Sequence, residues 1–345
     1  METKEIMTEQ VKYTSKDFAT SNEVRWCPGC GDYSILAQMQ RTAPDINVKK
    51  ENMVWVSGIG CSSRFPYYMN TYGFHSIHGR APAIASGVKI ARPDLSVWVA
   101  TGDGDLLSIG GNHFIHACRR NMDLKILLFN NRIYGLTKGQ YSPTSEKGKK
   151  TKSTPFGSID FPFKPVSVAL ASGATFVARS IDREPKHLQQ MMARAAEHKG
   201  TAMIEIYQNC NIFNDGAFQH LTEKELKDEN VLYLEQGKPM VFGRAKDKGI
   251  RLDGLNPVLV DLSEGKFSVN DLWIHDEFDP NPARSFILSQ FIELENFPTP
   301  IGVISQIKKS TYDGDVQEQI EHIQKTKGVG DLQKVLLTGH TWKVE

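Results

Sequence analysis

Residues 102–131 read GDGDLLSIGGNHFIHACRRNMDLKILLFNN, and this stretch decides the fold expected for the chain. It begins where an apolar run, Leu95–Thr101, ends, and it closes on a second apolar run, Leu124–Asn130. The pattern between them, Leu107–Arg120, is helical. Two strands joined by a helix pair in parallel, because parallel strands need a long crossover connection. Gly102 and Asn131 are therefore expected at the same edge of one sheet, where parallel sheets bind their ligands.

The same rhythm extends through the first two-thirds of the sequence. Further strands are predicted at Met53–Ser57, Thr175–Arg179 and Ala202–Tyr207, and further helices at Tyr33–Arg41, Ala83–Ala91 and Pro185–His198. Nearly continuous apolar strands that alternate with helices predict an α/β fold, a parallel sheet covered by helices on both faces.

The regular alternation stops after Gln219, which divides the chain into two predicted parts. Residues 1–219 form the sheet domain, and residues 220–345 form a carboxy-terminal extension that packs on the domain or on a partner subunit. The extension contains helical patterns at Ser285–Leu294, Val316–Thr326 and Leu332–Leu337, and a short ordered piece is expected within Ser268–Asp279.

Charge and hydropathy exclude several classes of partner. The chain has 345 residues with 41 basic and 40 acidic side chains, a formal net charge of +1. Such a balance gives no overall field that would attract nucleic acid or an anionic membrane surface. The first residues, METKEIMTEQ, lack an apolar signal core, and apolar runs such as Ile126–Phe129 are too short to cross a bilayer. We therefore expect a cytoplasmic protein with neither nucleic-acid nor membrane partners.

Residues 138–163, KGQYSPTSEKGKKTKSTPFGSIDFPF, interrupt the pattern with a long polar loop. Loops of this length inside a compact domain are usually functional or disordered. Two interpretations stay open. The loop is either a solvated basic segment or a lid whose lysines face an anionic ligand or an acidic protein.

Oxygen-bearing groups at the sheet edge predict a site for a hard cation. Asp103 offers a carboxylate, Asn131 an amide oxygen, and Ile133 a backbone carbonyl, which together with phosphate oxygens suit Mg²⁺. The glycines allow the backbone to approach phosphates, and the start of the following helix favours negative charge. A dinucleotide fingerprint is excluded, because its third glycine position is occupied by Leu107.

The chain contains five cysteines, and four of them fall in loops beside elements of the sheet domain. Cys27 and Cys30 precede the first helix, Cys61 follows the first strand, and Cys210 follows the Ala202–Tyr207 strand. Four thiolates can hold tetrahedral zinc or a 4Fe–4S cluster. Structural zinc usually uses two close pairs, so the isolated Cys61 and Cys210 favour a cluster. Cys118 lies within a predicted helix and is expected to be a small buried side chain.

These segments together resemble the β subunits of the 2-oxoacid:ferredoxin oxidoreductases. The resemblance covers most of residues 20–220 and rests on the motifs WCPGCGDYSIL, VSGIGCSSR, IHGRAPAIASGVK, GDGDLLSIGGNHFIHACRRN, FNNRIYGLTKGQYSPTS and QNC. The thirty residues from Gly102 to Asn131 are similar to the thiamine-diphosphate motif, which begins with GDG and ends with NN. The resemblance implies a pyrophosphate-type thiamine-diphosphate-binding domain.

The resemblance also implies site residues. A 4Fe–4S cluster would be held by Cys27, Cys30, Cys61 and Cys210. Mg²⁺ would be held by Asp103, Asn131 and the carbonyl of Ile133. Thiamine diphosphate would contact Ile59, Gly60, Cys61, Ser62, His78, Gly79, Arg80, Ala81, Gly102, Asp103, Gly104, Asp105, Asn131, Gly135 and Leu136. Catalytic or substrate-binding roles fall to His78, Arg64 and Lys138, with either cation a candidate for a distal substrate carboxylate.

The activity implied is the interconversion of 2-oxoglutarate, coenzyme A and oxidised ferredoxin with succinyl-CoA, CO₂ and reduced ferredoxin. The stretch YGLTKGQYSPTS is similar to members that use 2-oxoglutarate or broad 2-oxoacids. No second half-site for the aminopyrimidine ring is evident, which implies an α subunit, an α₂β₂ assembly and no turnover by this chain alone. The alternatives are pyruvate or another 2-oxoacid as substrate, a non-oxidative thiamine-dependent decarboxylase, and a structural zinc protein.

Overall fold

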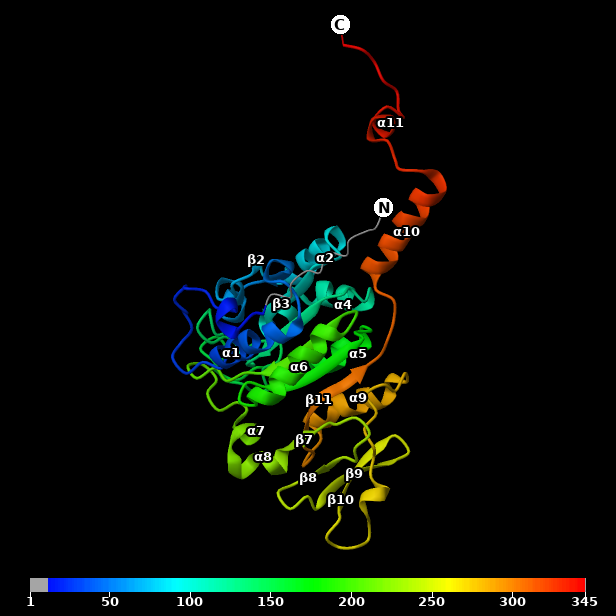
Figure 1. The fold of residues 1–345 in the computed structure, drawn as a ribbon. Coiled ribbons are helices and arrows are strands. Elements are labelled where there is room, and N and C mark those ends of the chain that lie inside the picture. Colours follow the sequence, from blue (N-terminus) through cyan, green and yellow to red (C-terminus); the bar gives the residue numbers. More distant parts are fainter. Residues whose placement is uncertain (1–11, 345) are drawn as a thin grey trace.

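A computed structural model describes residues 12–344, and its centre is an eight-stranded sheet (Figure 1). The order of the strands is β2-β1-β3-β4-β6-β5-β11-β7. Their bounds are Met53–Ser57 (β1), Tyr72–His75 (β2), Ser96–Gly102 (β3), Lys125–Asn130 (β4), Phe176–Ile181 (β5), Ala202–Tyr207 (β6), Val231–Tyr233 (β7) and Thr299–Gln306 (β11). The strands from β2 to β5 all pair in parallel, whereas β11 is antiparallel to β5. The predicted α/β class is confirmed.

Helices cover both faces of the sheet, because successive strand residues point to opposite sides. Val54 and Val56 of β1 belong to one apolar cluster, and Met53 and Trp55 belong to another. The first cluster is closed by helices α2 (Ala81–Ala91), α4 (Gly111–Arg119), α5 (Pro165–Ala171) and α9 (Pro282–Gln290). The second is closed by α1 (Asp32–Thr42) and α6 (Pro185–Glu197).

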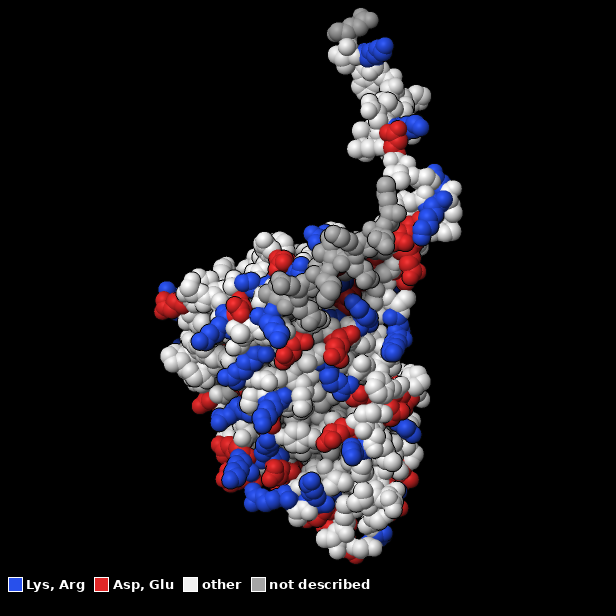
Figure 2. Space-filling model, viewed as in Figure 1, with Lys and Arg blue, Asp and Glu red and all other residues white. Residues whose placement is uncertain are grey.

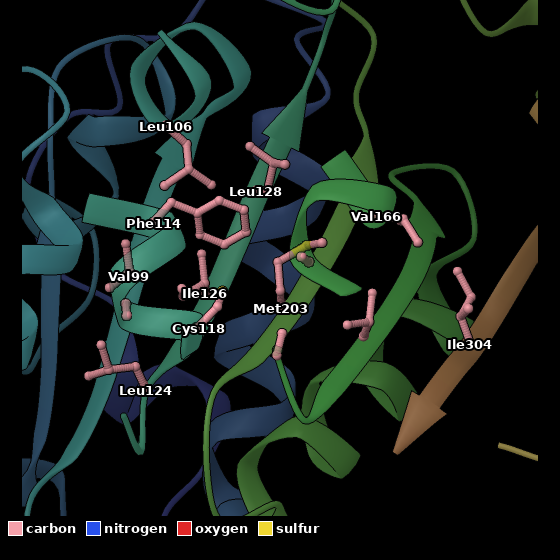
Figure 3. Packing of buried hydrophobic residues seen from close by; sticks show 14 of the residues in the cluster. Val99, Leu106, Phe114, Cys118, Leu124, Ile126, Leu128, Val166, Met203 and Ile304 are labelled. Carbon is pink, nitrogen blue, oxygen red and sulfur yellow. The ribbon is translucent and has the colours of Figure 1, made fainter. Parts of the chain in front are cut away.

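Figure 3 shows how α4 packs on the sheet. Phe114 and Cys118 point from the helix towards Val99 of β3 and towards Ile126 of β4. Both helix side chains are fully buried. The expectation that Cys118 is a small buried residue of the core is confirmed.

The helix predicted over Leu107–Arg120 is wrong at its start. The chain instead forms a short helix, α3 (Asp103–Leu107), and α4 begins only at Gly111. At the break, the backbone of Gly110 packs against Gly79, and a Cβ atom at Gly110 would lie 2.5 Å from the carbonyl oxygen of Asp105. Ser108, with ψ −111°, has left the helical conformation at this break. Periodicity along the sequence registers neither this turn nor the contact with Gly79.

The carboxy-terminal part adds to the same sheet and builds a smaller one. It contains α7 (Gln219–Thr222), α8 (Lys224–Asn230) and a three-stranded sheet of β8 (Val241–Phe242), β9 (Lys248–Asp253) and β10 (Asn256–Asp261). The predicted ordered piece contains a 3-10 turn, Val269–Asp271, and the three predicted helices correspond to α9, α10 (Tyr312–Lys327) and α11 (Leu332–Leu336). Strands β7 and β11 of this part belong to the main sheet. The division of the chain into two parts at residue 219 remains a prediction.

Helices α10 and α11 extend away from the body of the molecule (Figure 1). On the face shown in Figure 2, basic and acidic side chains are intermixed, which agrees with the nearly balanced charge. Within residues 12–344, no helix combines the length and the apolar character needed to cross a bilayer.

A buried ion pair lies where β5 and β6 pair. Arg179 and Glu205 are register partners, both side chains are fully buried, and Arg179 Nε donates to Glu205 Oε2 over 2.7 Å. The other oxygen of Glu205 accepts a 2.8 Å hydrogen bond from Asn130 Nδ2, at the end of β4. The pair thus ties the core of the sheet to the strand end that precedes Asn131.

We expect Arg179→Met to lower the free energy of unfolding by about 3–5 kcal/mol, because it leaves Glu205 buried without its charge partner. Urea unfolding followed by circular dichroism measures the change. Lys248→Met is the matched control, since it breaks the half-exposed pair with Glu229 and should cost at most about 1 kcal/mol. If both variants lost the same free energy of unfolding, burial would not be the reason for the cost of breaking the Arg179–Glu205 pair.

Candidate functional site

A cavity of about 560 Å³ opens at the carboxyl ends of β1, β3 and β4. Its volume lies in the range typical of small-molecule and cofactor sites. It is lined by Ile59, Gly60, Cys61, Ser62, His78, Gly102, Asp103, Gly104, Asp105, Asn131, Ile133, Tyr134, Gly135, Leu136, Thr137 and Gln140. Four segments that are remote in sequence (residues 59–62, 78, 102–105 and 131–140) thus meet at the edge that the strand pattern predicted.

Several predicted residues do not line this cavity. Gly79 lies behind it, where its N–H donates to Asp105, and Ala81 is fully buried at the start of α2. The Arg80 guanidinium donates to the carbonyl of Ile109. Arg64 lies in the 3-10 helix after Cys61, and Lys138 is exposed. The roles predicted for these five residues stay predictions.

Asp103 is buried at the floor of the cavity and is held by the long loop. Its Oδ2 accepts hydrogen bonds of 2.5 Å from both Ser142 Oγ and Thr144 Oγ1. Burial raises the pKa of Asp103, and the two hydroxyl donors oppose that rise. The other carboxylate oxygen, Oδ1, is not engaged by these hydroxyls. The sequence did not indicate this support, although Ser142 and Thr144 belong to the quoted SPTS stretch.

The turn after β4 presents the other candidate metal ligands. The Asn131 side-chain oxygen accepts a 3.1 Å hydrogen bond from the N–H of Ile133, and Asn214 Nδ2 donates to the Asn131 carbonyl over 2.9 Å. Asp103, Asn131 and Ile133 line one cavity. A carboxylate, an amide oxygen and a carbonyl are hard donors, so this set fits Mg²⁺ completed by phosphate and water oxygens.

Asp105 forms hydrogen bonds with three segments around the cavity. Its Oδ1 accepts from Ile59 N over 3.0 Å and contacts His78 Nδ1 at 2.7 Å, and its Oδ2 accepts from Thr101 Oγ1 over 2.8 Å. A Cβ atom at Gly58 would lie 2.0 Å from Asp105 Oδ2, so a glycine is required there. Because a carboxylate only accepts hydrogen bonds, Nδ1 carries the proton and Nε2 of His78 is left for a ligand.

Tyr134, Thr137 and Gln140 line the cavity although the sequence did not single them out. Tyr134 Oη donates to the carbonyl of Gly104 over 3.0 Å. This contact closes one wall between α3 and the turn after β4. Helix α3 itself has only five residues, so the charge effect expected from a helix start is small here.

The four predicted cluster cysteines gather beside this cavity. A Cβ atom built on Gly135 would lie 3.6 Å from the Sγ atoms of both Cys61 and Cys210, so those sulfurs lie within twice that distance of each other. The Cys27–Cys30 turn is closed by a 3.0 Å hydrogen bond from Cys30 N to the Cys27 carbonyl. Gly31 N donates to the Asn209 carbonyl, which pins this turn to the Cys210 loop.

The pKa values of Cys30 and Cys61 are raised in part because the cysteines lie close to one another. Burial, then the charge of Asp32, then Cys210 and Cys27 raise the pKa of Cys61 to about 12. Burial and Asp32, followed by Cys210 and Cys61, also raise the pKa of Cys30. With these raised pKa values the two thiols stay protonated, unless a cationic group between them stabilises the thiolates. Within residues 12–344, no three His, Cys, Asp or Glu side chains are grouped as ligands of a single metal ion.

The donor chemistry of these cysteines fits an iron–sulfur cluster. Four thiolates are the usual ligands of a 4Fe–4S cluster. Gly135 lies beside Cys61 and Cys210 and has no side chain that would approach their sulfurs. Cys61 both lines the cavity and belongs to the cysteine group, so the two sites adjoin.

Several known proteins are similar to this chain. Residues 53–206 match the family described as thiamine pyrophosphate enzyme, C-terminal TPP binding domain. The chain is 50% identical over 332 residues to the 2-oxoglutarate oxidoreductase subunit KorB of Mycobacterium tuberculosis, covering 96% of this chain and 88% of that protein. It is 43% identical over 220 residues to the 2-oxoglutarate synthase subunit KorB of Methanocaldococcus jannaschii, covering 62% and 81% respectively.

A solved structure is similar over nearly the whole length. It is the 2-oxoglutarate:ferredoxin oxidoreductase from Magnetococcus marinus with 2-oxoglutarate, coenzyme A and succinyl-CoA bound. The TM-score is 0.76 at 30% identity, with 96% of this chain and 98% of that chain covered. Together with the relatives above, this similarity shows that the chain belongs to the family of β subunits of the 2-oxoglutarate:ferredoxin oxidoreductases, the KorB family.

Proposed function

We propose that this chain is the β subunit of an enzyme that carries out the coenzyme A-dependent oxidative decarboxylation of 2-oxoglutarate and passes the electrons to ferredoxin. The observation that carries the proposal is the position of Cys61, which lines the cofactor-sized cavity and also lies in the cysteine group. A substrate held in the cavity would be adjacent to an electron acceptor held by the cysteines.

The residues present fit three resident groups. Thiamine diphosphate would occupy the cavity, Mg²⁺ would be held by Asp103, Asn131 and the Ile133 carbonyl, and a 4Fe–4S cluster by Cys27, Cys30, Cys61 and Cys210. When bound, the thiamine group supplies the carbon nucleophile and electron sink for decarboxylation, and the cluster takes up electrons singly.

The chain's own groups position these parts. Ser142 and Thr144 hold one oxygen of Asp103, so its other oxygen would be available to the cation. Asp105 fixes the ring of His78 through Nδ1, which leaves Nε2 to bind or move a proton at the cavity wall. Burial of both carboxylates limits their contact with water and strengthens these interactions.

A partner subunit is proposed to complete the site. Ile59 and Leu136 line the cavity, yet these apolar side chains are 39% and 48% exposed. Apolar groups at the mouth of a cavity are suited to burial against another protein surface. We therefore propose an α subunit that covers this mouth in an α₂β₂ assembly, with ferredoxin as the electron-accepting partner.

Arg64 is the first candidate for the distal carboxylate of 2-oxoglutarate, because its charge lies close enough to Cys61 to oppose the raised pKa of that thiol. We expect Arg64→Ala to lower kcat/KM for 2-oxoglutarate about tenfold to 100-fold, the effect of losing a hydrogen bond between charged groups. Turnover of pyruvate, which lacks that carboxylate, should change less than about threefold. Assays with both substrates measure the ratio of kcat/KM for 2-oxoglutarate to kcat/KM for pyruvate. The same ratio in Lys138→Ala tests the other candidate cation. Equal losses for both substrates would exclude this role.

The proposed function is tested by purifying the chain without oxygen, alone and together with its α subunit. Acyl-CoA formation and ferredoxin reduction are then measured with 2-oxoglutarate, pyruvate and other 2-oxoacids. Only the complex should turn over, with 2-oxoglutarate preferred. Aldehyde release without ferredoxin reduction would indicate a non-oxidative decarboxylase. A colourless chain that contains zinc and no iron would indicate a structural zinc protein.

A further inference from the structure

Gln208 connects the end of the central sheet to the cysteine group. It directly follows β6 and is only 1% exposed. Its side-chain Nε2 donates to Cys30 Sγ over 3.3 Å and to the Asn209 carbonyl over 2.5 Å. Its backbone N–H donates to the Asn130 carbonyl over 3.0 Å, which fixes the residue on β4. The amide is therefore held against the sulfur by the sheet rather than by the loop that carries Cys30.

The orientation of this amide follows from its neighbours. Both groups near Nε2, the Cys30 sulfur and the Asn209 carbonyl, act as acceptors, so the NH₂ end must face them. The Oε1 end is buried without a hydrogen-bond partner among the described residues. An unpaired buried carbonyl costs stability, which an apolar residue of similar size would avoid. The buried amide thus places a donor at the Cys30 sulfur although its own carbonyl stays unpaired.

The charge of the reduced cluster explains what a donor at this sulfur would do. A reduced cluster carries one more negative charge than an oxidised cluster, and its thiolate ligands share it. A hydrogen bond to a thiolate therefore favours the reduced form, and hydrogen bonds to sulfur are among the determinants of cluster potentials.

We propose that Gln208 sets the reduction potential of the cluster by donating its Nε2–H to Cys30, and so makes the cluster easier to reduce than its buried surroundings alone would allow. The proposal rests on the assignment of the four cysteines to a 4Fe–4S cluster. Gln208 acts through Cys30 and is not required to contact substrate or to hold iron.

The test is a redox titration of the α/β complex, purified without oxygen and followed by electron paramagnetic resonance. Gln208→Leu removes the donor at similar volume, and Gln208→Glu replaces it with an acceptor. The oxidised-to-reduced ratio at a fixed potential should rise about tenfold in Gln208→Leu, which corresponds to about 59 mV towards more negative values for one electron. The shift should be larger in Gln208→Glu. Gln290→Leu, the same change on α9, is the matched control and should leave the potential unchanged.

The outcomes separate this inference from the proposed function. A wild-type complex without iron or a cluster signal would contradict the proposed function itself. A full cluster with the wild-type potential in both Gln208 variants would contradict the inference alone. Loss of iron from both variants, with iron retained in Gln290→Leu, would also contradict it, because Gln208 would then be needed to hold the cluster rather than to set its potential.

Discussion

Asp103→Ala is expected to weaken the binding of thiamine diphosphate with Mg²⁺ by more than about 100-fold and to reduce turnover to background. Substitutions of residues that merely support a metal ligand typically cost 10–100-fold, and Asp103 is proposed as a ligand itself. The free energy of unfolding should change little, because burial already disfavours the charged form of this carboxylate and raises its pKa. Isothermal titration with cofactor and Mg²⁺, beside urea unfolding, measures both quantities.

Thr144→Val is the matched control for this prediction. It keeps the Asp103 carboxylate and removes one of the two hydroxyls that hold its Oδ2. We expect a cofactor affinity about tenfold below that of the unmodified protein, and therefore above that of Asp103→Ala. Wild-type affinity in Asp103→Ala would place the diphosphate and its cation elsewhere.

Cys210→Ala is expected to lose most of its iron and to lower ferredoxin reduction more than about 100-fold. A cluster of four irons needs its thiolate ligands, and binding of such a group is coupled to the local structure that holds it. Cys210 is buried, and its loop is closed by a 2.9 Å hydrogen bond from Asn214 N to the Cys210 carbonyl. Iron and acid-labile sulfide per chain, measured in the α/β complex, report the loss directly.

Cys118→Ala provides the control, since it removes the thiol that lies in the core below α4 (Figure 3). This variant should keep its full iron content and its ferredoxin reduction. If Cys210→Ala also kept four irons, the ligand set would have to be a different one. If neither protein contained iron and both bound zinc, the electron-transfer function would be excluded.

Much of the fold could be predicted because its strands are buried on both faces. Apolar runs such as Met53–Ser57 and Ala202–Tyr207 have the bounds that the structure shows for β1 and β6. The loop over residues 138–163 contains no helix or strand, as predicted. By contrast, all four residues of β2 are exposed, so no apolar pattern marks this edge strand. Strand β7 escaped prediction because its three residues, Val231–Tyr233, are too few to show a strand pattern. Strand β11, Thr299–Gln306, was also missed although it is buried.

Some residues of the candidate site could likewise be predicted from the sequence, and others could not. Glycines, carboxylates and amides at strand ends identified Asp103 and Asn131, because the ends of parallel strands must meet at one edge. Asp105 was expected only from the resemblance to the family. The hydroxyls of Ser142 and Thr144 could not be assigned, since their role depends on how a loop of 26 residues folds back over β3 and β4. The same is true of the amide of Gln208, which reaches a cysteine 178 residues away in the sequence.

The sequence by itself determined the class of the sheet, the edge that carries the cavity and the kinds of donor found there, because hydrophobic period and residue chemistry are local properties. Only the tertiary structure decided which oxygen of Asp103 is held by hydroxyls, which nitrogen of His78 is left for a ligand, and that the amide of Gln208 meets the sulfur of Cys30. These outcomes depend on distances of a few ångströms between segments that meet only when the sheet has formed.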